Sequence, residues 1–202
     1  MKFVIVGIGT DVGKTVVASI FTKALNAWYW KPIQSGDLHF SDTDKVASYV
    51  GNSFKKIDEK WRLNTPASPH FAASIDEVVI RENDFQIPTV SSLIIEGAGG
   101  LMVPLNNEGL LYLDLLQKWN IPVILVSRHY LGSINHTLLS IEALKSRNIS
   151  IDRVVFNGDE NKATESIIKT LHPDLKYIRI NQLDELNPKI IEIEAEKIRG
   201  CF

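Results

Sequence analysis

The stretch KFVIVGIGTDVGKT, residues 2–15, decides the fold of this 202-residue chain. Its first part is a short apolar run rich in β-branched residues, which is typical of a buried strand. Gly13, Lys14 and Thr15 then lead into a segment whose apolar residues recur at helical spacing. A phosphate-binding loop has this setting, but it keeps four residues between its first glycine and Gly-Lys-Ser/Thr. Five residues separate Gly7 from Gly13, so the loop is either broken or lengthened.

Lys14 and Thr15 have the side chains that a bound polyphosphate requires. Backbone N–H groups at a helix N-terminus attract phosphate, the lysine reaches the β- and γ-phosphates, and the hydroxyl ligates Mg²⁺. A plain strand–turn–helix, with glycines only for the turn, is the other interpretation. The position of Gly-Lys-Thr between both elements favours the phosphate site.

Short apolar runs and helical patterns alternate along the rest of the chain. Strands are expected at residues 3–6, 93–95, 123–126 and 154–156, with weaker candidates at 28–33 and 177–180. Helices are expected at residues 14–27, 112–119, 133–146 and 161–171. This alternation predicts an α/β fold with a doubly wound, mostly parallel sheet and helices on both faces, in one domain over residues 1–202. Residues 35–91 are expected to be irregular and to carry substrate contacts.

Net charge, hydropathy and cysteine content argue against some classes of partner and of cell compartment. A net charge of −2 offers no overall attraction for nucleic acid or an anionic membrane. No apolar run approaches the roughly 20 residues of a membrane span. The single cysteine, Cys201, allows no internal disulfide. We therefore expect a cytoplasmic protein with no nucleic-acid or membrane partner.

Two acidic positions are candidates for a Mg²⁺ site, because phosphate-bound Mg²⁺ usually takes one or two carboxylates. Glu96 ends the apolar run LIIE and begins EGAGG, although a solvated glutamate at a turn is the other interpretation. The second acid lies in SDTD, as Asp42 or Asp44. A helix is expected next, so Asp42 or Thr43 could instead be its cap.

Lys31 lies in YWKPIQSG, at the end of the expected second strand. There its ammonium would face the phosphate loop across the strand ends. It could then stabilise the negative charge that develops beside a γ-phosphate. A solvated surface lysine is the other interpretation.

Taken together, five stretches resemble the dethiobiotin synthetase family of the P-loop NTPase superfamily. They are GIGTDVGKT, KPIQSG, SPHFAA, IIEGAGGLMVPL and LGSINHTLL, in the family's order over residues 1 to about 160. The family's loop has the five-residue spacing, so the loop here looks lengthened. The resemblance implies an ATP-dependent ligase acting on 7,8-diaminononanoate, CO₂ and MgATP. One amine forms a carbamate, ATP phosphorylates it, and the second amine closes the cyclic urea and releases phosphate.

The resemblance also implies roles for single residues. Lys14 and Lys31 would be catalytic. Mg²⁺ would be held by Thr15, Asp44 and Glu96, with Asp42 as the alternative to Asp44. The diamine and carbamate would meet Thr10, Lys31 and Ser35. The nucleotide would contact Asp11, Val12, Gly13, Lys14, Thr15, Val16, Asp44, Glu96, Gly97, Ala98, Gly99 and Asn157.

In this family the substrate carboxylate is held across a dimer interface, which implies a homodimer. The matching residues here are Gly132, Ser133, Ile134 and Asn135, at the start of an expected helix. Free N–H groups at a helix N-terminus favour a carboxylate. An ordinary helix start after Gly132 is the other interpretation.

Three stretches depart from the family pattern. Residues 127–130, Ser-Arg-His-Tyr, replace the usual small and apolar residues. Asn157 matches a purine-binding asparagine, but Gly158 adds a residue before Asp159. Residues 180–185 lack the proline-containing pattern expected around the base. The preference for adenine over another base therefore stays open.

Two other function classes share parts of this pattern. Switch ATPases of the partitioning and cell-division type place a signature lysine four residues before the motif's glycine, where this chain has Gly9. A small-molecule kinase would use the same loop but form a stable phosphorylated product.

Overall fold

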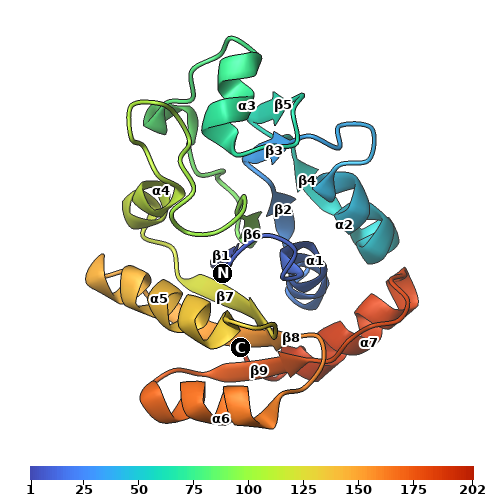
Figure 1. Ribbon diagram of the computed structural model, residues 1–202. Coiled ribbons are helices and arrows are strands. Elements are labelled where there is room, and N and C mark those ends of the chain that lie inside the picture. The colour runs from blue at the N-terminus through green and yellow to red at the C-terminus, as the bar shows by residue number, and fades with distance from the viewer.

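Seven parallel strands form the central sheet of the structure, a computed structural model that describes all 202 residues (Figure 1). Across the sheet the strands run in the order β4-β2-β6-β1-β7-β8-β9. Their bounds are β1 (Lys2–Gly7), β2 (Trp28–Trp30), β4 (Lys55–Ile57), β6 (Leu93–Glu96), β7 (Val123–Arg128), β8 (Ile151–Asn157) and β9 (Tyr177–Ile180). Two more strands, β3 (Ile33–Ser35) and β5 (Trp61–Leu63), pair in parallel as a separate small sheet.

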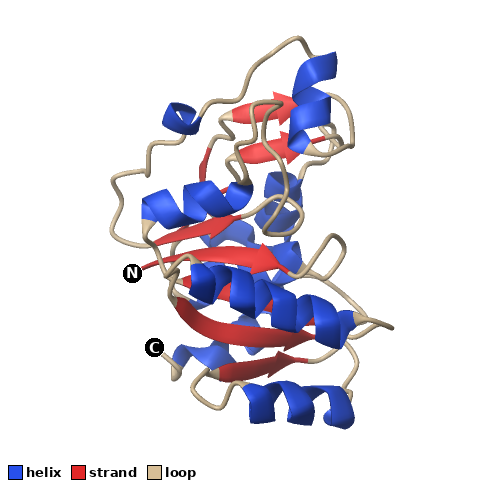
Figure 2. Cartoon of the chain, turned by 60° about the vertical axis from the view of Figure 1, so that its left-hand side comes forward, coloured by secondary structure: helices blue, strands red, loops and turns tan.

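Helices cover both faces of the central sheet (Figure 2). Their bounds are α1 (Lys14–Ala24), α2 (Asp42–Val50), α3 (Pro69–Ile75), α4 (Tyr112–Trp119), α5 (Ser133–Ser146), α6 (Lys162–Leu171) and α7 (Pro188–Arg199), with short 3₁₀ turns at Gly51–Ser53 and Glu82–Asp84. α1, α2 and α7 pack together on one face, and α5 and α6 pack together on the other. No helix combines the length and apolarity needed to cross a bilayer. The prediction of a doubly wound, mostly parallel α/β fold is confirmed.

The middle strands are apolar without alternation because helices cover both of their faces. Val4 and Ile5 of β1, Ile94 and Ile95 of β6, and Ile124 of β7 have no exposed surface. The expected strands at residues 3–6, 93–95, 123–126, 154–156 and 177–180 are all present, most of them slightly longer. Burial of these apolar side chains holds the carboxyl ends of the strands in place.

The single strand expected at residues 28–33 is wrong. β2 ends at Trp30, and the chain enters the small sheet as β3 at Ile33. Pro32 has no N–H to donate to a central ladder, so it separates the two strands. This break leaves Lys31 directly beyond the end of β2.

Two helix boundaries also differ from expectation. The first helix stops at Ala24 instead of residue 27, because Asn26 has a left-handed φ of 46°. α6 begins one residue late because Asn161 is its N-cap and accepts a hydrogen bond from the N–H of Thr164. Residues 35–91 are less irregular than expected, since they contain α2, β4, β5 and α3.

All seven strands are parallel, so their carboxyl ends lie along one edge of the sheet. Five segments follow those ends directly: the phosphate loop after β1, Lys31 after β2, Gly97 after β6, His129 after β7 and Gly158 after β8. Segments far apart in the sequence therefore meet at this edge.

Candidate active site

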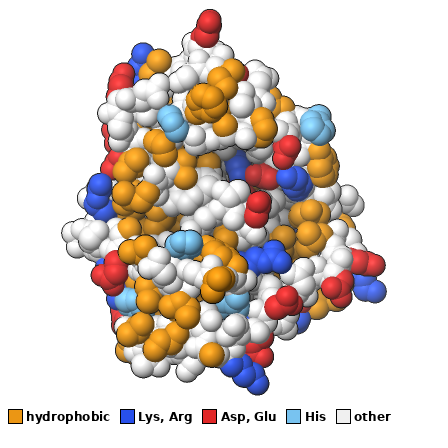
Figure 3. All heavy atoms as spheres, viewed as in Figure 1, with side chains coloured by type: hydrophobic (Ala, Val, Ile, Leu, Met, Phe, Trp, Pro, Cys, Tyr) orange, Lys and Arg blue, Asp and Glu red, His pale blue; other side chains and the backbone are white.

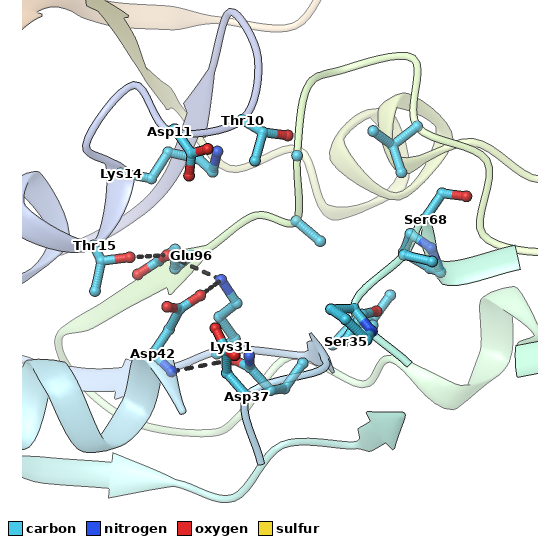
Figure 4. A pocket seen from close by; sticks show the side chains of 18 of the residues that line it. Thr10, Asp11, Lys14, Thr15, Lys31, Ser35, Asp37, Asp42, Ser68 and Glu96 are labelled. Atoms are coloured by element: carbon cyan, nitrogen blue, oxygen red, sulfur yellow. Dashed lines mark hydrogen bonds and ion pairs between the residues drawn. The ribbon is translucent and has the colours of Figure 1, made fainter. Parts of the chain in front are cut away.

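A cavity of about 760 Å³ opens at the carboxyl ends of β1, β2 and β6. One wall is the phosphate loop, and the opposite wall contains residues 33–37 and 66–69. Figure 3 shows acidic and basic side chains gathered at a hollow in this face. Figure 4 shows Thr15, Lys31, Asp42 and Glu96 pointing toward one another inside it. The cavity therefore brings together most of the residues that the motifs single out.

The phosphate loop leads into α1 through Gly13, which has a left-handed φ of 90°. A Cβ on Gly13 would lie 2.0 Å from the Nδ2 atom of Asn157, so only glycine fits there. Asn157 also donates a hydrogen bond from Nδ2 to the carbonyl oxygen of Val12 at 2.9 Å. No side chain caps the N-terminus of α1. Its first N–H groups are thus available to an anion.

Lys14 is largely buried and has no carboxylate partner. Its Nζ atom donates to the carbonyl oxygen of Gly9 at 2.8 Å, and it forms no salt bridge. Burial, and then the positive charge of Lys31, lower the pKa of Lys14 to about 8. A cation held in this way gains stability from an anionic ligand.

Strand register places Lys31 opposite Glu96. β2 pairs with β6 so that Tyr29 lies beside Ile94 and Trp30 beside Ile95, and Lys31 follows directly after β2 while Glu96 is the last residue of β6. The Nζ atom of Lys31 donates to Oε1 of Glu96 at 3.0 Å and also contacts Asp42. Burial disfavours the charge, but Glu96 and Asp42 outweigh it and raise the pKa of Lys31.

Glu96 is buried and divides its two oxygens between different partners. Oε1 accepts hydrogen bonds from Thr15 at 2.9 Å and from Lys31. Oε2 accepts one from the hydroxyl of Tyr29 at 2.8 Å. Burial raises the pKa of Tyr29 well above its ordinary value, so the hydroxyl keeps its proton. The motifs do not mark Tyr29; the signal for it is that it lies two residues before Lys31, on the same face of the strand.

Of the two candidate aspartates, Asp44 lies outside the cavity. The carboxylate of Asp44 accepts hydrogen bonds from the N–H and hydroxyl of Ser41, the N-cap of α2, in a capping box. It does not line the cavity, whereas Asp42 does. Asp42 contacts Lys31, and its Oδ1 atom accepts from Lys45 at 3.1 Å. The cap is Ser41 and neither Asp42 nor Thr43, which leaves Asp42 as the acid that faces Glu96.

The side of the cavity away from the phosphate loop carries small polar groups. Ser35 lies on this side, whereas Thr10 lines the cavity from the phosphate loop (Figure 4). The hydroxyl of Ser35 is buried and has no hydrogen-bond partner. Because Ser35 lines the cavity, its unpartnered hydroxyl could bond a ligand there.

The remaining nucleotide positions divide into two groups. Asp11, Ala98 and Gly99 line the cavity. Gly97 instead packs against the ring of Tyr112. Val12 and Val16 direct their side chains into the apolar core, so only their backbone atoms are available to a nucleotide.

Residues Gly132 to Asn135 lie apart from this cavity. They form the start of α5, where Gly132 is the N-cap, and no side chain caps the helix. With His129, Tyr130 and Leu131 they line a second cavity of about 750 Å³. The structure therefore does not bring them to the phosphate loop of the same chain.

The four residues at 127–130 point in different directions. Ser127 is buried and bonded to Thr137 at 2.8 Å. Arg128 lines the cavity of about 760 Å³ and donates to Gln182 at 3.1 Å. His129 lies beside Glu165, with 3.2 Å between Nε2 and Oε1. The hydroxyl of Tyr130 lies 2.7 Å from Nδ1 of His136.

A second ion cluster, built around the buried Glu165 and missed by sequence reasoning, lies beyond β8. Arg179 of β9 contacts Glu165 of α6 and donates to the carbonyl oxygen of Gly158 at 2.8 Å. His129 contacts the same glutamate. We call Arg179, Glu165 and His129 the Arg179 cluster. It holds the loop that follows Asn157, and its members come from three separate elements.

The chain is similar to proteins of one family over nearly its whole length. A family model described as "AAA domain" matches residues 1–189. The ATP-dependent dethiobiotin synthetase BioD of Christiangramia forsetii is 50% identical over 98% of this chain and 96% of that protein. The protein of the same name from Brucella anthropi is 46% identical over 99% of this chain and 92% of that protein.

Solved structures share the fold at much lower identity. A ParA family ATPase from Chlorobium tepidum has a TM-score of 0.58 and 15% identity, and the match covers 96% of this chain and 97% of that chain. A putative plasmid partition protein from Borrelia burgdorferi, bound to AMPPNP, has a TM-score of 0.59 and 12% identity over 100% and 98% of the two chains. These likenesses concern the fold alone.

Proposed function

The chain belongs to the family of ATP-dependent dethiobiotin synthetases, and from this premise we propose how its residues divide the reaction among them. It is an ATP-dependent ligase that forms dethiobiotin in biotin biosynthesis, with ATP as co-substrate. The partitioning ATPases share its fold at 12–15% identity, whereas the synthetases match it at 46–50%. The switch-ATPase and kinase alternatives are therefore not favoured.

The triphosphate of ATP binds at the start of α1. The free N–H groups of this helix and the ammonium of Lys14 supply the positive end of the site. Burial lowers the pKa of Lys14 and so disfavours its charged form. An anionic phosphate beside Lys14 would stabilise that charged form. Asn157 holds the loop in shape through the carbonyl oxygen of Val12.

Thr15, Asp42 and Glu96 hold Mg²⁺. The donor set fits this ion, because Mg²⁺ prefers oxygen ligands and takes one or two carboxylates together with substrate phosphates. The structure contains no group of three or more His, Cys, Asp or Glu side chains that would form an all-protein cage. When bound, Mg²⁺ neutralises phosphate charge during transfer. The single observation that carries the proposal is one connected set of contacts, in which Thr15 and Lys31 donate to Glu96 and Lys31 also contacts Asp42 (Figure 4).

Lys31 acts on the transferring phosphoryl group. Its charge is kept by two carboxylates, and its ammonium lies between the phosphate loop and the polar wall of the cavity. An ammonium fixed there stabilises the charge that builds up as a carbamate oxygen takes the γ-phosphoryl group. Its backbone position directly after β2 is fixed by the sheet.

Thr10 and Ser35 hold the 7,8-diaminononanoate and its carbamate. The unpartnered hydroxyl of Ser35 supports this role. The second amine then attacks the phosphorylated carbamate, which forms the cyclic urea and releases phosphate. Both amines belong to one molecule, so the ring closure is intramolecular, and the cavity holds the second amine beside the phosphorylated carbamate.

We also propose a cytoplasmic homodimer in which the start of α5 of one copy serves the cavity of the other. Gly132 to Asn135 lie outside their own nucleotide cavity, and their helix N-terminus has no side-chain cap. Leu131, Ile134 and Leu139 are exposed around it. Free N–H groups at this position suit the carboxylate end of the substrate.

The test is phosphate release from MgATP with and without 7,8-diaminononanoate plus bicarbonate, with the organic product followed by mass spectrometry. We expect release that depends on the diamine and a product with the mass of the cyclic urea. Turnover indifferent to the diamine would contradict the proposal, and a stable phosphorylated product would indicate a kinase.

A further inference from the structure

Tyr29 touches the proposed metal site from inside the core. It is the middle residue of β2 and has no exposed surface. Its hydroxyl donates to Oε2 of Glu96 at 2.8 Å. The proposed function gives this hydroxyl no role.

The position of Tyr29 follows from strand pairing. Tyr29 lies beside Ile94, two residues before Glu96 on the neighbouring strand. A diagonal neighbour at this separation is within reach of an aromatic side chain. The ring of Phe54 packs against that of Tyr29, with centroids 5.9 Å apart, and helps to hold it. Strand β2 of the central sheet thus fixes the position of the Tyr29 hydroxyl.

The two oxygens of Glu96 face different surroundings. Oε1 meets Thr15 and Lys31, which line the cavity, whereas Oε2 meets only Tyr29. The side chain of Glu96 has no exposed surface, so water does not reach Oε2. Without Tyr29 this oxygen would be buried without a donor, and the carboxylate would turn to find one.

We propose that Tyr29 is a positioning residue that fixes the carboxylate of Glu96 with Oε1 toward the phosphate loop, and thereby sets the affinity for Mg²⁺. The inference rests on the proposed function, in which Glu96 helps to hold this ion. Partners that orient a metal-binding carboxylate are a general part of metal sites, and their loss typically weakens binding by about 10- to 100-fold.

The chain contains a matched control in Tyr112. It is also buried beside this site, and its ring lies about 3.2 Å from where a Cβ on Gly97 would be. Its hydroxyl has no hydrogen-bond partner. Tyr112→Phe removes the same atom from the same neighbourhood as Tyr29→Phe, but it removes no bond to Glu96.

The experiment measures Mn²⁺ binding by electron paramagnetic resonance, in the presence of a non-hydrolysable ATP analogue, and the Mg²⁺ dependence of turnover. The proteins are wild type, Tyr29→Phe, Tyr112→Phe and Glu96→Gln. We expect Tyr29→Phe to weaken Mn²⁺ binding about tenfold and to raise the Mg²⁺ requirement equally, with turnover at saturating Mg²⁺ close to wild type. Tyr112→Phe should match wild type. Binding of the nucleotide without metal should stay unchanged in Tyr29→Phe, which checks that the phosphate loop is intact.

Wild-type metal affinity in Tyr29→Phe, combined with weakened binding in Glu96→Gln, would overturn this inference and leave the proposed function standing. Equal losses in Tyr29→Phe and Tyr112→Phe would also overturn it, because the cause would then be packing. Unchanged binding in Glu96→Gln would instead remove Glu96 from the metal site, and both proposals would fail at that residue.

Discussion

Two ion clusters lie at the same edge of the sheet and differ in their charge balance. In the Lys31 cluster, formed by Lys31, Glu96 and Asp42, two carboxylates share one buried ammonium. In the Arg179 cluster one carboxylate, Glu165, is shared by Arg179 and His129. The first cluster borders a cavity of about 760 Å³, whereas Arg179 donates to the backbone carbonyl oxygens of Gly158 and Asp159 in the loop after β8.

The difference shows that an ion cluster can either bind a ligand or fix a loop. The Lys31 cluster has more carboxylates than buried cations and is open to a cavity. It therefore attracts a further cation, and that cation can in turn bind a phosphate. A cluster with more donors than carboxylates binds carbonyl oxygens and fixes a loop. Burial makes both arrangements expensive to leave unpaired, so each also defines the local structure. The following predictions separate ligand binding in the Lys31 cluster from loop positioning in the Arg179 cluster.

The largest effect is expected from Lys31→Ala. If Lys31 stabilises transferred charge, turnover should fall by about 10²- to 10³-fold, the range seen when one preorganised donor is lost. The affinity for a non-hydrolysable ATP analogue should fall much less, because Lys14 and the N-terminus of α1 remain. Steady-state kinetics measure the turnover, and calorimetry measures the affinity for the ATP analogue. Equal losses in both would show that Lys31 only helps to assemble the pocket.

Asp42→Asn and Asp44→Asn form a matched pair that tests which aspartate belongs to the Lys31 cluster. Asp42→Asn should raise the Mg²⁺ concentration for half-maximal activity by about 10- to 100-fold, as expected for the loss of a group that supports a metal site. Asp44→Asn should leave that concentration unchanged and lower the free energy of unfolding by about 0.5–2 kcal/mol through the weakened capping box. The reverse result would restore Asp44 as the metal ligand.

The Lys31 cluster was largely predictable from sequence. Lys31 and Glu96 each follow an apolar run, and in a parallel sheet the carboxyl ends of the strands meet at one edge. The choice between Asp42 and Asp44 stayed open because local pattern does not show which residue caps a helix. Ser41 takes an extended backbone conformation and uses the carboxylate three residues later, which removes Asp44 from the site.

Tyr29 and the Arg179 cluster were not predictable in the same way. The contact of Tyr29 with Glu96 depends on β2 lying beside β6, and strand order is not contained in any local pattern. Arg179 and Glu165 come from β9 and α6, and each alone looks like a solvated charge. Their meeting depends on how α6 packs at the end of the sheet, which is a property of the whole fold.

A smaller effect concerns Lys14, which lacks the carboxylates that Lys31 has. Its pKa of about 8 in the free protein should rise when phosphate binds, so binding takes up a proton between the free and bound pKa values. The affinity for ATP should be constant below the free pKa and fall by at most about tenfold per pH unit above it. Calorimetry at about pH 8.5, in buffers of different ionisation enthalpy, measures the uptake directly. Lys14→Met should abolish it, and uptake that persists in this variant would assign the proton to another group.

The smallest effect is expected in the Arg179 cluster. Burial, and then the charge of Arg179, lower the pKa of His129 below its ordinary value, because Arg179 already occupies the Glu165 oxygen that would favour a protonated ring. The unfolded chain therefore binds a proton more readily than the folded one, and stability should fall as the pH drops below about 6.5. One proton contributes at most about 1.4 kcal/mol per pH unit, and solvent at the rim of the cluster reduces this. Urea unfolding of wild type and His129→Asn between about pH 7 and pH 5 measures the difference in slope. A shallower slope in the variant, with ATP affinity unchanged, would show that this cluster supports the fold without entering the chemistry; parallel slopes would mean that His129 titrates alike in both states.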